Sequence, residues 1–113
     1  MAENELQEKA FEVIEIAKRS GKIKKGSNEV TKAVEKGIAK LAVVAGDVNP
    51  AEIVMHIEPL CKEKSVPFIK VSSKDELGTA AGLPVSTTAV AVINEGDAKA
   101  QLEKLVKELN ATE

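Results

Sequence analysis

Hydrophobic residues follow two different spacings along this chain, and each spacing predicts one kind of secondary structure. Residues 4–19 have apolar side chains three and four positions apart, which is the pattern of an amphipathic helix. The residues on that apolar face are Leu6, Ala10, Val13, Ile14 and Ala17. Gly21 then predicts a C-terminal cap for this helix. A second helix is expected over residues 28–36, where Gly37 ends the pattern.

The second spacing is an unbroken run of apolar residues, which is typical of a strand buried on both faces. Two segments have it, LAVVA at residues 41–45 and TAVAVIN at residues 88–94. Two shorter segments, KIKK at residues 22–25 and PFIKV at residues 67–71, are expected to form further strands. The sequence therefore predicts about four strands.

Sequence signals for helix starts lie between these strands. The tetrapeptides that begin at Asn49 and at Ser73 both read as capping boxes, with Pro50 at the first helical position of the former. Pro59 lacks an N–H, so a break or restart is expected there. The helix after Ser73 should end near Gly82, and Asp97 should cap a last helix that runs to about residue 109.

Strands and helices alternate along the whole chain, a pattern that predicts the α/β class. We expect a single-domain, three-layer α/β/α sandwich around a mixed, mostly parallel sheet of about four strands. The domain should span residues 1–113, with residues 1–3 and 110–113 as frayed ends.

Composition narrows the classes of protein that this chain can belong to. Aromatic residues make up 2% of the chain, so few rings are available for stacking on bases and the core must be aliphatic. A single cysteine cannot form an internal disulfide, and the first ten residues hold no apolar run typical of a signal peptide. A cytoplasmic protein without membrane spans is expected.

The formal net charge of −2 hides a strong asymmetry along the chain. Residues 18–40 hold eight basic and two acidic side chains, or +6, whereas the remainder holds eight basic and sixteen acidic ones, or −8. A local positive field on an acidic protein indicates a polyanion bound at one place, although a solvated charged face fits the same count.

Known catalytic patterns are absent or incomplete. The chain contains neither a Gly-x-x-x-x-Gly-Lys-Ser/Thr loop nor a Gly-x-Gly-x-x-Gly turn. His56 lies one helical turn after Glu52, but no second histidine or cysteine pair completes a metal site. Cys61 lies five residues after His56, so the two side chains should point in different directions. No cofactor, metal or catalytic residue is predicted.

Asp47 follows a buried strand, and Lys70 lies on the next strand, an arrangement that has a weak resemblance to the phospho-acceptor site of receiver domains. Those domains place an acidic pair after their first strand, where this chain has KIKKG. Asp47 is therefore expected to begin the loop that leads to the Asn49 cap.

The segment KIKKGSNEVTKAVEK at residues 22–36 is the most informative part of the sequence. It surrounds a helix N-terminus, where free backbone N–H groups and the helix dipole attract anions, with four lysines: Lys22, Lys24, Lys25 and Lys32. Gly26 lets a ligand backbone approach closely. The Asn28 amide has a donor and an acceptor suited to base edges, and Glu29 is either a first-turn acid or an acceptor for base amino groups. A capping turn that binds nothing remains the alternative.

Four blocks in order resemble the archaeal large-subunit ribosomal proteins of the L-seven-Ae family, which bind kink-turns in RNA. They are KIKKGSNEVTKAVEKG at 22–37, LAVVAGDVNP at 41–50, PLCKEKSVPF at 59–68 and LGTAAGLPV at 77–85. The resemblance extends from about Phe11 to the final helix, and it implies an α/β/α sandwich with an RNA partner.

The resemblance also assigns roles to individual residues. It implies that Asn28 and Glu29 read the tandem sheared G·A pairs of a kink-turn, that Lys25 and Lys32 grip phosphates, and that Gly26 permits close approach. The loop Leu83-Pro84-Val85-Ser86 would cover the flipped-out nucleotide with apolar contacts.

The implied function is non-catalytic binding to kink-turns in large-subunit ribosomal RNA and in box C/D and H/ACA guide RNAs, with ribonuclease P as a further assembly. Scaffold and methyltransferase proteins would be partners, and the free protein would be monomeric. The alternative is a protein-interaction module of the same superfamily that has lost RNA binding. The intact set of Asn28, Glu29 and Lys32 favours RNA.

Overall fold

The computed structural model describes residues 3–111. Its elements follow the predicted alternation of helices and strands: α1 (Glu3–Ser20), β1 (Lys22–Lys25), α2 (Ser27–Glu35), β2 (Leu41–Ala45), α3 (Glu52–Met55), α4 (Ile57–Lys64), β3 (Phe68–Val71), α5 (Lys74–Ala80), β4 (Ala89–Asn94), the 3-10 helix η1 (Gly96–Ala98) and α6 (Lys99–Ala111).

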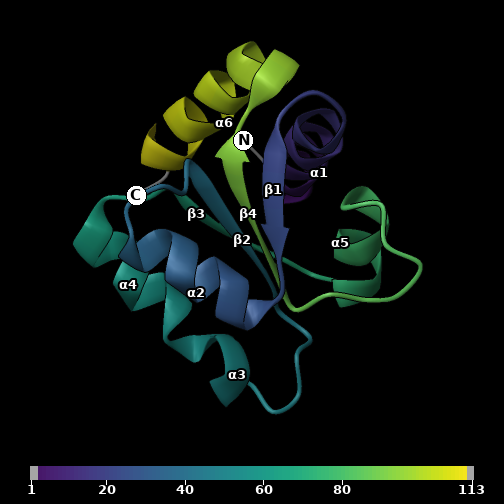
Figure 1. Cartoon of the computed structure of the whole chain (residues 1–113), viewed down its shortest axis with the longest axis vertical. Coiled ribbons are helices and arrows are strands. Elements are labelled where there is room, and N and C mark those ends of the chain that lie inside the picture. The colour runs from purple at the N-terminus through teal and green to yellow at the C-terminus, as the bar shows by residue number, and fades with distance from the viewer. Residues whose placement is uncertain (1–2, 112–113) are drawn as a thin grey trace.

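Four strands form one mixed sheet with the order β1-β4-β2-β3, and helices cover both of its faces (Figure 1). Helix α1 packs against β1, β3 and β4 and against α5 and α6, whereas α2 packs against β1, β4 and α4. The three layers confirm the predicted single-domain α/β/α sandwich.

The prediction of a mostly parallel sheet is wrong. Strand β4 lies between β1 and β2 and runs antiparallel to both, so β2 and β3 form the parallel pair. The reason lies in the connection after α5. After β3 the chain forms α5 and then runs back along the side of this helix. Two hydrogen bonds hold the returning segment to α5: Leu83 N–H donates to the Gly78 carbonyl, and Thr87 N–H donates to the Lys74 carbonyl. The chain therefore enters β4 from the edge at which it left β3.

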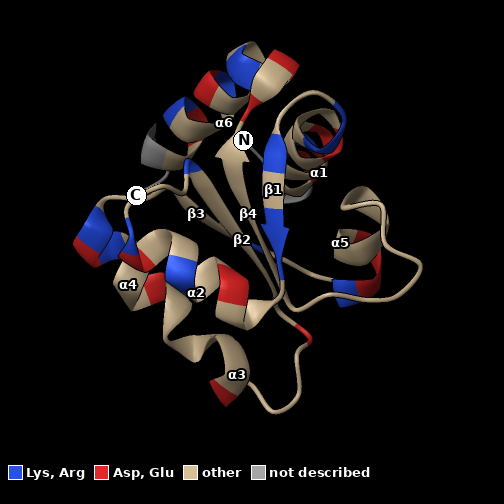
Figure 2. Cartoon of the chain, in the orientation of Figure 1, with Lys and Arg blue, Asp and Glu red and all other residues tan. Residues whose placement is uncertain are grey.

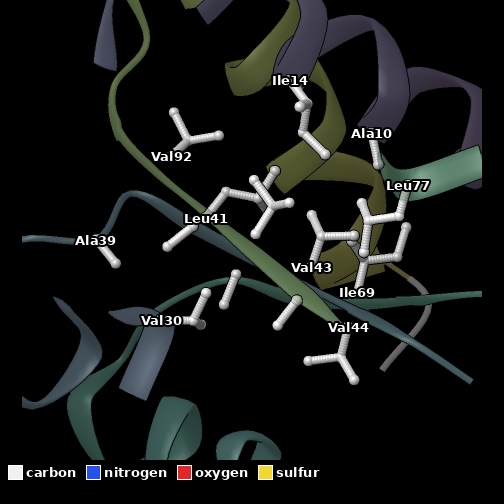
Figure 3. Packing of buried hydrophobic residues seen from close by; sticks show 14 of the residues in the cluster. Ala10, Ile14, Val30, Ala39, Leu41, Val43, Val44, Ile69, Leu77 and Val92 are labelled. Carbon is white, nitrogen blue, oxygen red and sulfur yellow. The ribbon is translucent and has the colours of Figure 1, made fainter. Parts of the chain in front are cut away.

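The core is aliphatic, as the near absence of aromatic residues requires (Figure 3). Side chains alternate across the sheet, so Val43 points toward the side of Ile14 and Leu77, whereas Val44 points toward the side of Val30. All five residues of β2 are buried because helices cover both of its faces. This confirms the interpretation of LAVVA as a strand buried on both sides.

The expected caps have mixed outcomes. Ser73 caps α5, because its Oγ accepts from Glu76 N–H at 3.2 Å. The expected cap at Asn49 is wrong, because α3 begins only at Glu52, after the N-cap residue Ala51, and no side chain caps it. Asp97 is not a cap either, because it lies inside η1.

The helical pattern breaks near Pro59, as expected. Helix α3 ends at Met55, and α4 begins at Ile57, which places Pro59 in its first turn. A first-turn residue needs no acceptor for its N–H, so proline is tolerated there. Gly21 follows α1 without the left-handed φ of a typical C-cap; a Cβ at that position would instead collide with the Asn94 carbonyl.

The expected frayed ends fall largely outside the described residues. Residues 1–2 and 112–113 lie there, whereas Glu3 and Ala111 are in the end turns of α1 and α6. Within the described part of the chain, no helix combines the length and apolar character needed to cross a membrane.

Candidate functional site

Two segments that the sequence analysis singled out meet at one edge of the sheet. Strand β1 ends at this edge, and β4 begins there, because the two strands are antiparallel. Gly26 N–H, directly after β1, donates to the carbonyl of Ala89 at 2.8 Å. The β1–α2 turn and the α5–β4 loop (residues 81–88) therefore leave the sheet side by side (Figure 1).

The N-terminus of α2 has no side-chain cap. Its N-cap residue is Gly26, with φ of 94° and ψ of 150°, a conformation that favours glycine. A Cβ at Gly26 would meet no atom within 4 Å, so the space beside this turn is open. The first hydrogen bond of the helix is Val30 N–H to the Gly26 carbonyl at 3.0 Å, and the N–H groups before it have no partner within the helix.

The polar side chains of α2 point away from the core. Val30, Ala33 and Val34 are buried, whereas Asn28, Glu29 and Lys32 are exposed. Among the described residues, the side chains of these three polar residues make no hydrogen bond or ion pair. Lys25, at the end of β1, is exposed as well. The Asn28 amide and the Glu29 carboxylate thus lie in the first turn of α2, with the Lys25 ammonium just before it and the Lys32 ammonium one turn further along the helix, and all four remain free for a ligand.

The α5–β4 loop presents an apolar surface. Val85 is 66% exposed and Pro84 is exposed too, whereas Leu83 packs against the core. The loop backbone lies directly on α5, because a Cβ at Gly78 would collide with the Val85 carbonyl. Helix α5 therefore supports this part of the site, with Pro84 and Val85 left for contact.

Positive charge is concentrated on β1, which holds three lysines and no acidic residue, whereas α2 carries Lys32 together with Glu29 and Glu35 (Figure 2). Of the basic residues in 18–40, Lys40 is the one that forms an ion pair within the described part of the chain, at 3.9 Å from Glu95. The remaining seven lack such a partner there, so their charges are not neutralised by direct ion pairs. This surface attracts anions.

Two side chains could suggest catalysis, but Cys61 is buried in the core and His56 forms a hydrogen bond with Thr31. Cys61 is fully buried in α4, and burial, together with the nearby Glu58 carboxylate, raises the pKa of its thiol to about 11. A thiol that stays protonated is a poor nucleophile. The His56 ring nitrogen Nε2 lies 2.7 Å from Thr31 Oγ1. The described residues contain no group of three or more acidic, histidine or cysteine side chains placed to hold a metal ion.

Asp47 has a structural role that the sequence did not indicate. Its Oδ1 accepts from Lys74 N–H at 2.8 Å, so it satisfies a donor at the start of α5. Asp47 begins the loop after β2, as expected, and the structure also ties it to α5. It joins Ser73 in fixing the helix that supports the α5–β4 loop.

Sequence reasoning also missed Thr31 and His56, which are 25 residues apart and joined by the hydrogen bond described above. No local pattern links the two positions, because the contact arises only when α2 packs beside α4. Thr31 lies about one helical turn after Asn28, so this contact holds α2 close to the residues of the candidate site.

The fold and this surface together define an α/β/α protein that presents an anion-attracting helix N-terminus beside an apolar loop. The chain belongs to the Ribosomal protein L7Ae/L30e/S12e/Gadd45 family, whose model matches residues 8–102. It is similar in structure to the Giardia lamblia 15.5kD RNA binding protein, with a TM-score of 0.87 and 29% sequence identity. That similarity covers 95% of this chain and 89% of the Giardia chain.

Proposed function

We propose that this protein binds RNA and recognises kink-turns through the β1–α2 turn and the α5–β4 loop. The observation that carries the proposal is the uncapped start of α2, where Asn28, Glu29 and Lys32 are exposed and free of protein partners among the described residues. Membership of a ribosomal protein family and the similarity to an RNA-binding protein support it.

The proposed roles follow from the chemistry of each group. Asn28 has an amide that donates and accepts together, and Glu29 accepts from amino groups, so both suit the exposed edges of sheared G·A pairs. Lys25 and Lys32 flank them and neutralise phosphates. Gly26, with open space beside it, lets the RNA backbone reach the free N–H groups of α2.

The α5–β4 loop completes the proposed interface. A nucleotide that is flipped out of a kink exposes its base, and Pro84 and Val85 offer an exposed apolar surface to cover it. Leu83 anchors the loop to the core. The polar turn would thus bind the G·A pairs and the apolar loop the flipped-out nucleotide. These two parts of the RNA lie close together in the bent form and far apart in the extended form.

The proposed consequence is a shift of the RNA population toward the bent form. A protein that binds the bent form and not the extended form shifts the equilibrium between them by the difference between its affinities for the two forms. We assign this role to kink-turns of the large ribosomal subunit and of box C/D and H/ACA guide RNAs, and to ribonuclease P. Scaffold and methyltransferase proteins would then assemble on the bent RNA.

A titration with doubly labelled RNA tests this proposal. The protein is added to a kink-turn RNA with fluorophores at its two ends, and to a control RNA in which the G·A pairs are replaced. The chain has no Trp and no Tyr, so the signal must come from the RNA. Tight binding and bending of the first RNA alone is expected. Equal weak binding to both RNAs would contradict kink-turn recognition and favour the protein-interaction module.

A further inference from the structure

A relay of two hydrogen bonds connects the first turn of α2 to the junction between α3 and α4. Thr31 Oγ1 lies 2.7 Å from the carbonyl oxygen of Ser27, four residues earlier in the same helix. The same Oγ1 lies 2.7 Å from Nε2 of His56, the residue between α3 and α4. Thr31 is half-buried, whereas His56 is exposed.

The direction of both hydrogen bonds follows from counting protons. The Ser27 carbonyl can only accept, so the single hydroxyl proton of Thr31 must point toward it. The Thr31 oxygen is then left as an acceptor, and the His56 nitrogen must carry the proton that it donates. The opposite arrangement would leave two oxygens 2.7 Å apart with no proton between them. The relay therefore runs from His56 to Thr31 to Ser27.

This relay adds to the contacts that hold the start of α2, which are the hydrogen bond from Gly26 N–H to the Ala89 carbonyl and the buried side chain of Val30. Helix α2 has nine residues, a length at which a helix depends on its surroundings for stability. Helix α5 shows the usual solution, in which the Ser73 hydroxyl accepts from Glu76 N–H. Such a cap uses one of the free N–H groups of the helix. The start of α2 has no side-chain cap, so those groups remain open.

We propose that Thr31 and His56 are positioning residues for the RNA-binding turn. They hold the first turn of α2 through a carbonyl group, so the turn is fixed while its N–H groups stay free for the RNA. The relay thereby also holds the backbone turn from which the Asn28 and Glu29 side chains project. This inference rests on the proposed function, because it assigns to the relay a role in binding RNA.

Three variants test the relay through the affinity for the kink-turn RNA. His56→Ala removes one hydrogen bond of the relay and is expected to weaken binding roughly fivefold, the worth of a net hydrogen bond. Thr31→Val removes both hydrogen bonds and should weaken binding by at least as much. The double variant should bind within about twofold of the weaker single variant, because both changes break one unit. Thr31→Ser keeps the hydroxyl and should restore most of the affinity. The salt dependence of binding should not change, because every phosphate-binding lysine is still present.

A matched control comes from the other end of the sheet. Ser20 Oγ donates to the Ile16 carbonyl at 2.8 Å and accepts from Asp97 N–H at 2.8 Å, so it forms a relay of the same kind. Ser20→Ala should lower the urea midpoint to a similar extent as Thr31→Val. Ser20→Ala should leave the RNA affinity unchanged, because Ser20 lies before the first residue of β1, whereas the proposed RNA-binding turn lies after the last residue of β1. A purely structural role of Thr31 would make the two variants alike in both measurements.

Three results would overturn the inference. The first is that folded Thr31→Val and His56→Ala bind the kink-turn as tightly as the unmodified protein. The second is that their losses simply add in the double variant. Because His56 is exposed, His56→Ala decides the matter even if Thr31→Val fails to fold. The third is that the unmodified protein does not distinguish the kink-turn from the control RNA, a result that overturns the proposed function together with the relay's role in it.

Discussion

Asn28 and Lys32 lie one helical turn apart on the exposed face of α2, and the proposed interface gives them different tasks. An amide has two directed hydrogen-bonding groups and distinguishes base edges, whereas an ammonium group is a point charge that serves any phosphate. Substitutions at the two positions should therefore differ in kind as well as in size.

Asn28→Ala is expected to cost about 1–3 kcal/mol of binding free energy and to reduce discrimination between the kink-turn and the control RNA. Its effect on protein stability should be small, because Asn28 is exposed and makes no hydrogen bond within the described residues. Fluorescence titration with both RNAs measures the two effects. Unchanged affinity and discrimination would show that Asn28 does not read bases.

Lys32→Ala is expected to weaken binding to kink-turn and control RNA alike. For every phosphate that is no longer neutralised, the slope of log affinity against log salt should fall by roughly 0.7–0.9. Titrations at several salt concentrations give that slope. A loss of discrimination with an unaltered slope would contradict a phosphate contact at this position.

Cys61 predicts a pH dependence of stability. Its thiol pKa is raised from 9.0 to about 11 in the folded protein, so the folded state retains a proton that the unfolded state loses. The contribution of Cys61 is complete below pH 9 and falls as the pH rises from about 9 to about 11. Urea unfolding across this range should show a steeper loss of stability in the unmodified protein than in Cys61→Ala.

The control for that experiment is the reactivity of the thiol toward iodoacetamide. Labelling should be slow in the folded protein and fast in urea, because only unfolding exposes Cys61. Parallel stability curves for the two proteins would show that burial does not raise the pKa of this thiol.

At the scale of elements, the start of α5 is held by two side chains that accept from its backbone. Ser73 Oγ accepts from Glu76 N–H, and Asp47 Oδ1 accepts from Lys74 N–H. The α5–β4 loop lies on this helix, with its Val85 carbonyl against Gly78. The caps of α5 thus support a loop that the proposed function uses.

Ser73→Ala should lower the free energy of unfolding by about 0.5–2 kcal/mol, the usual cost of removing such a cap. Asp97→Ala is the matched control, because Asp97 is exposed and its side chain caps no helix; it should change stability by less than about 0.5 kcal/mol. Urea denaturation followed by circular dichroism measures both. Equal losses would contradict the assignment of the two roles.

At the scale of the whole molecule, the location of charge matters more than its sum. The chain is acidic overall, yet β1 carries three lysines and no acidic residue, and it leads directly into the start of α2 (Figure 2). Long-range attraction of a polyanion depends on the local field, which is screened over about 8 Å at physiological salt. An acidic protein can therefore bind RNA through one small surface.

Two charge-reversal pairs test this view at identical net charge. Lys25→Glu with Lys32→Glu alters the proposed interface, whereas Lys104→Glu with Lys107→Glu alters exposed positions of α6. The first pair should weaken RNA binding by at least about tenfold at moderate salt and lower the salt slope, because two phosphate-binding cations are replaced by carboxylates. The second pair should have little effect. Similar losses in both variants would show that only net charge matters.

The order of elements followed from the sequence, whereas the order of strands in the sheet did not. Apolar spacing and runs are local properties, so LAVVA and the helices on both sides of it were recognisable. Alternation of strands and helices favours parallel neighbours, but it does not indicate where β4 inserts. That position depends on the return of residues 81–88 along α5, which involves contacts to Gly78 and Lys74 that no local pattern indicates.

The predicted helix caps had different outcomes for a similar reason. A capping box is a sequence pattern whose hydrogen bonds compete with tertiary ones. Ser73 kept its role, whereas Asn49 lies before an extra turn and Asp97 lies within η1, where its N–H donates to Ser20. The tertiary partner decided the outcome in the last case.

The sequence by itself determined the alternating elements, the aliphatic composition of the core and the exposure of Lys25, Asn28, Glu29 and Lys32, because these follow from the spacing of residues within each helix and strand. Only the tertiary structure decided that the α5–β4 loop emerges beside that set, that Asp47 fixes α5 and that His56 reaches Thr31. Each of these contacts joins residues far apart in the chain. Their geometry follows from how the helices pack on the sheet, which side-chain spacing does not encode.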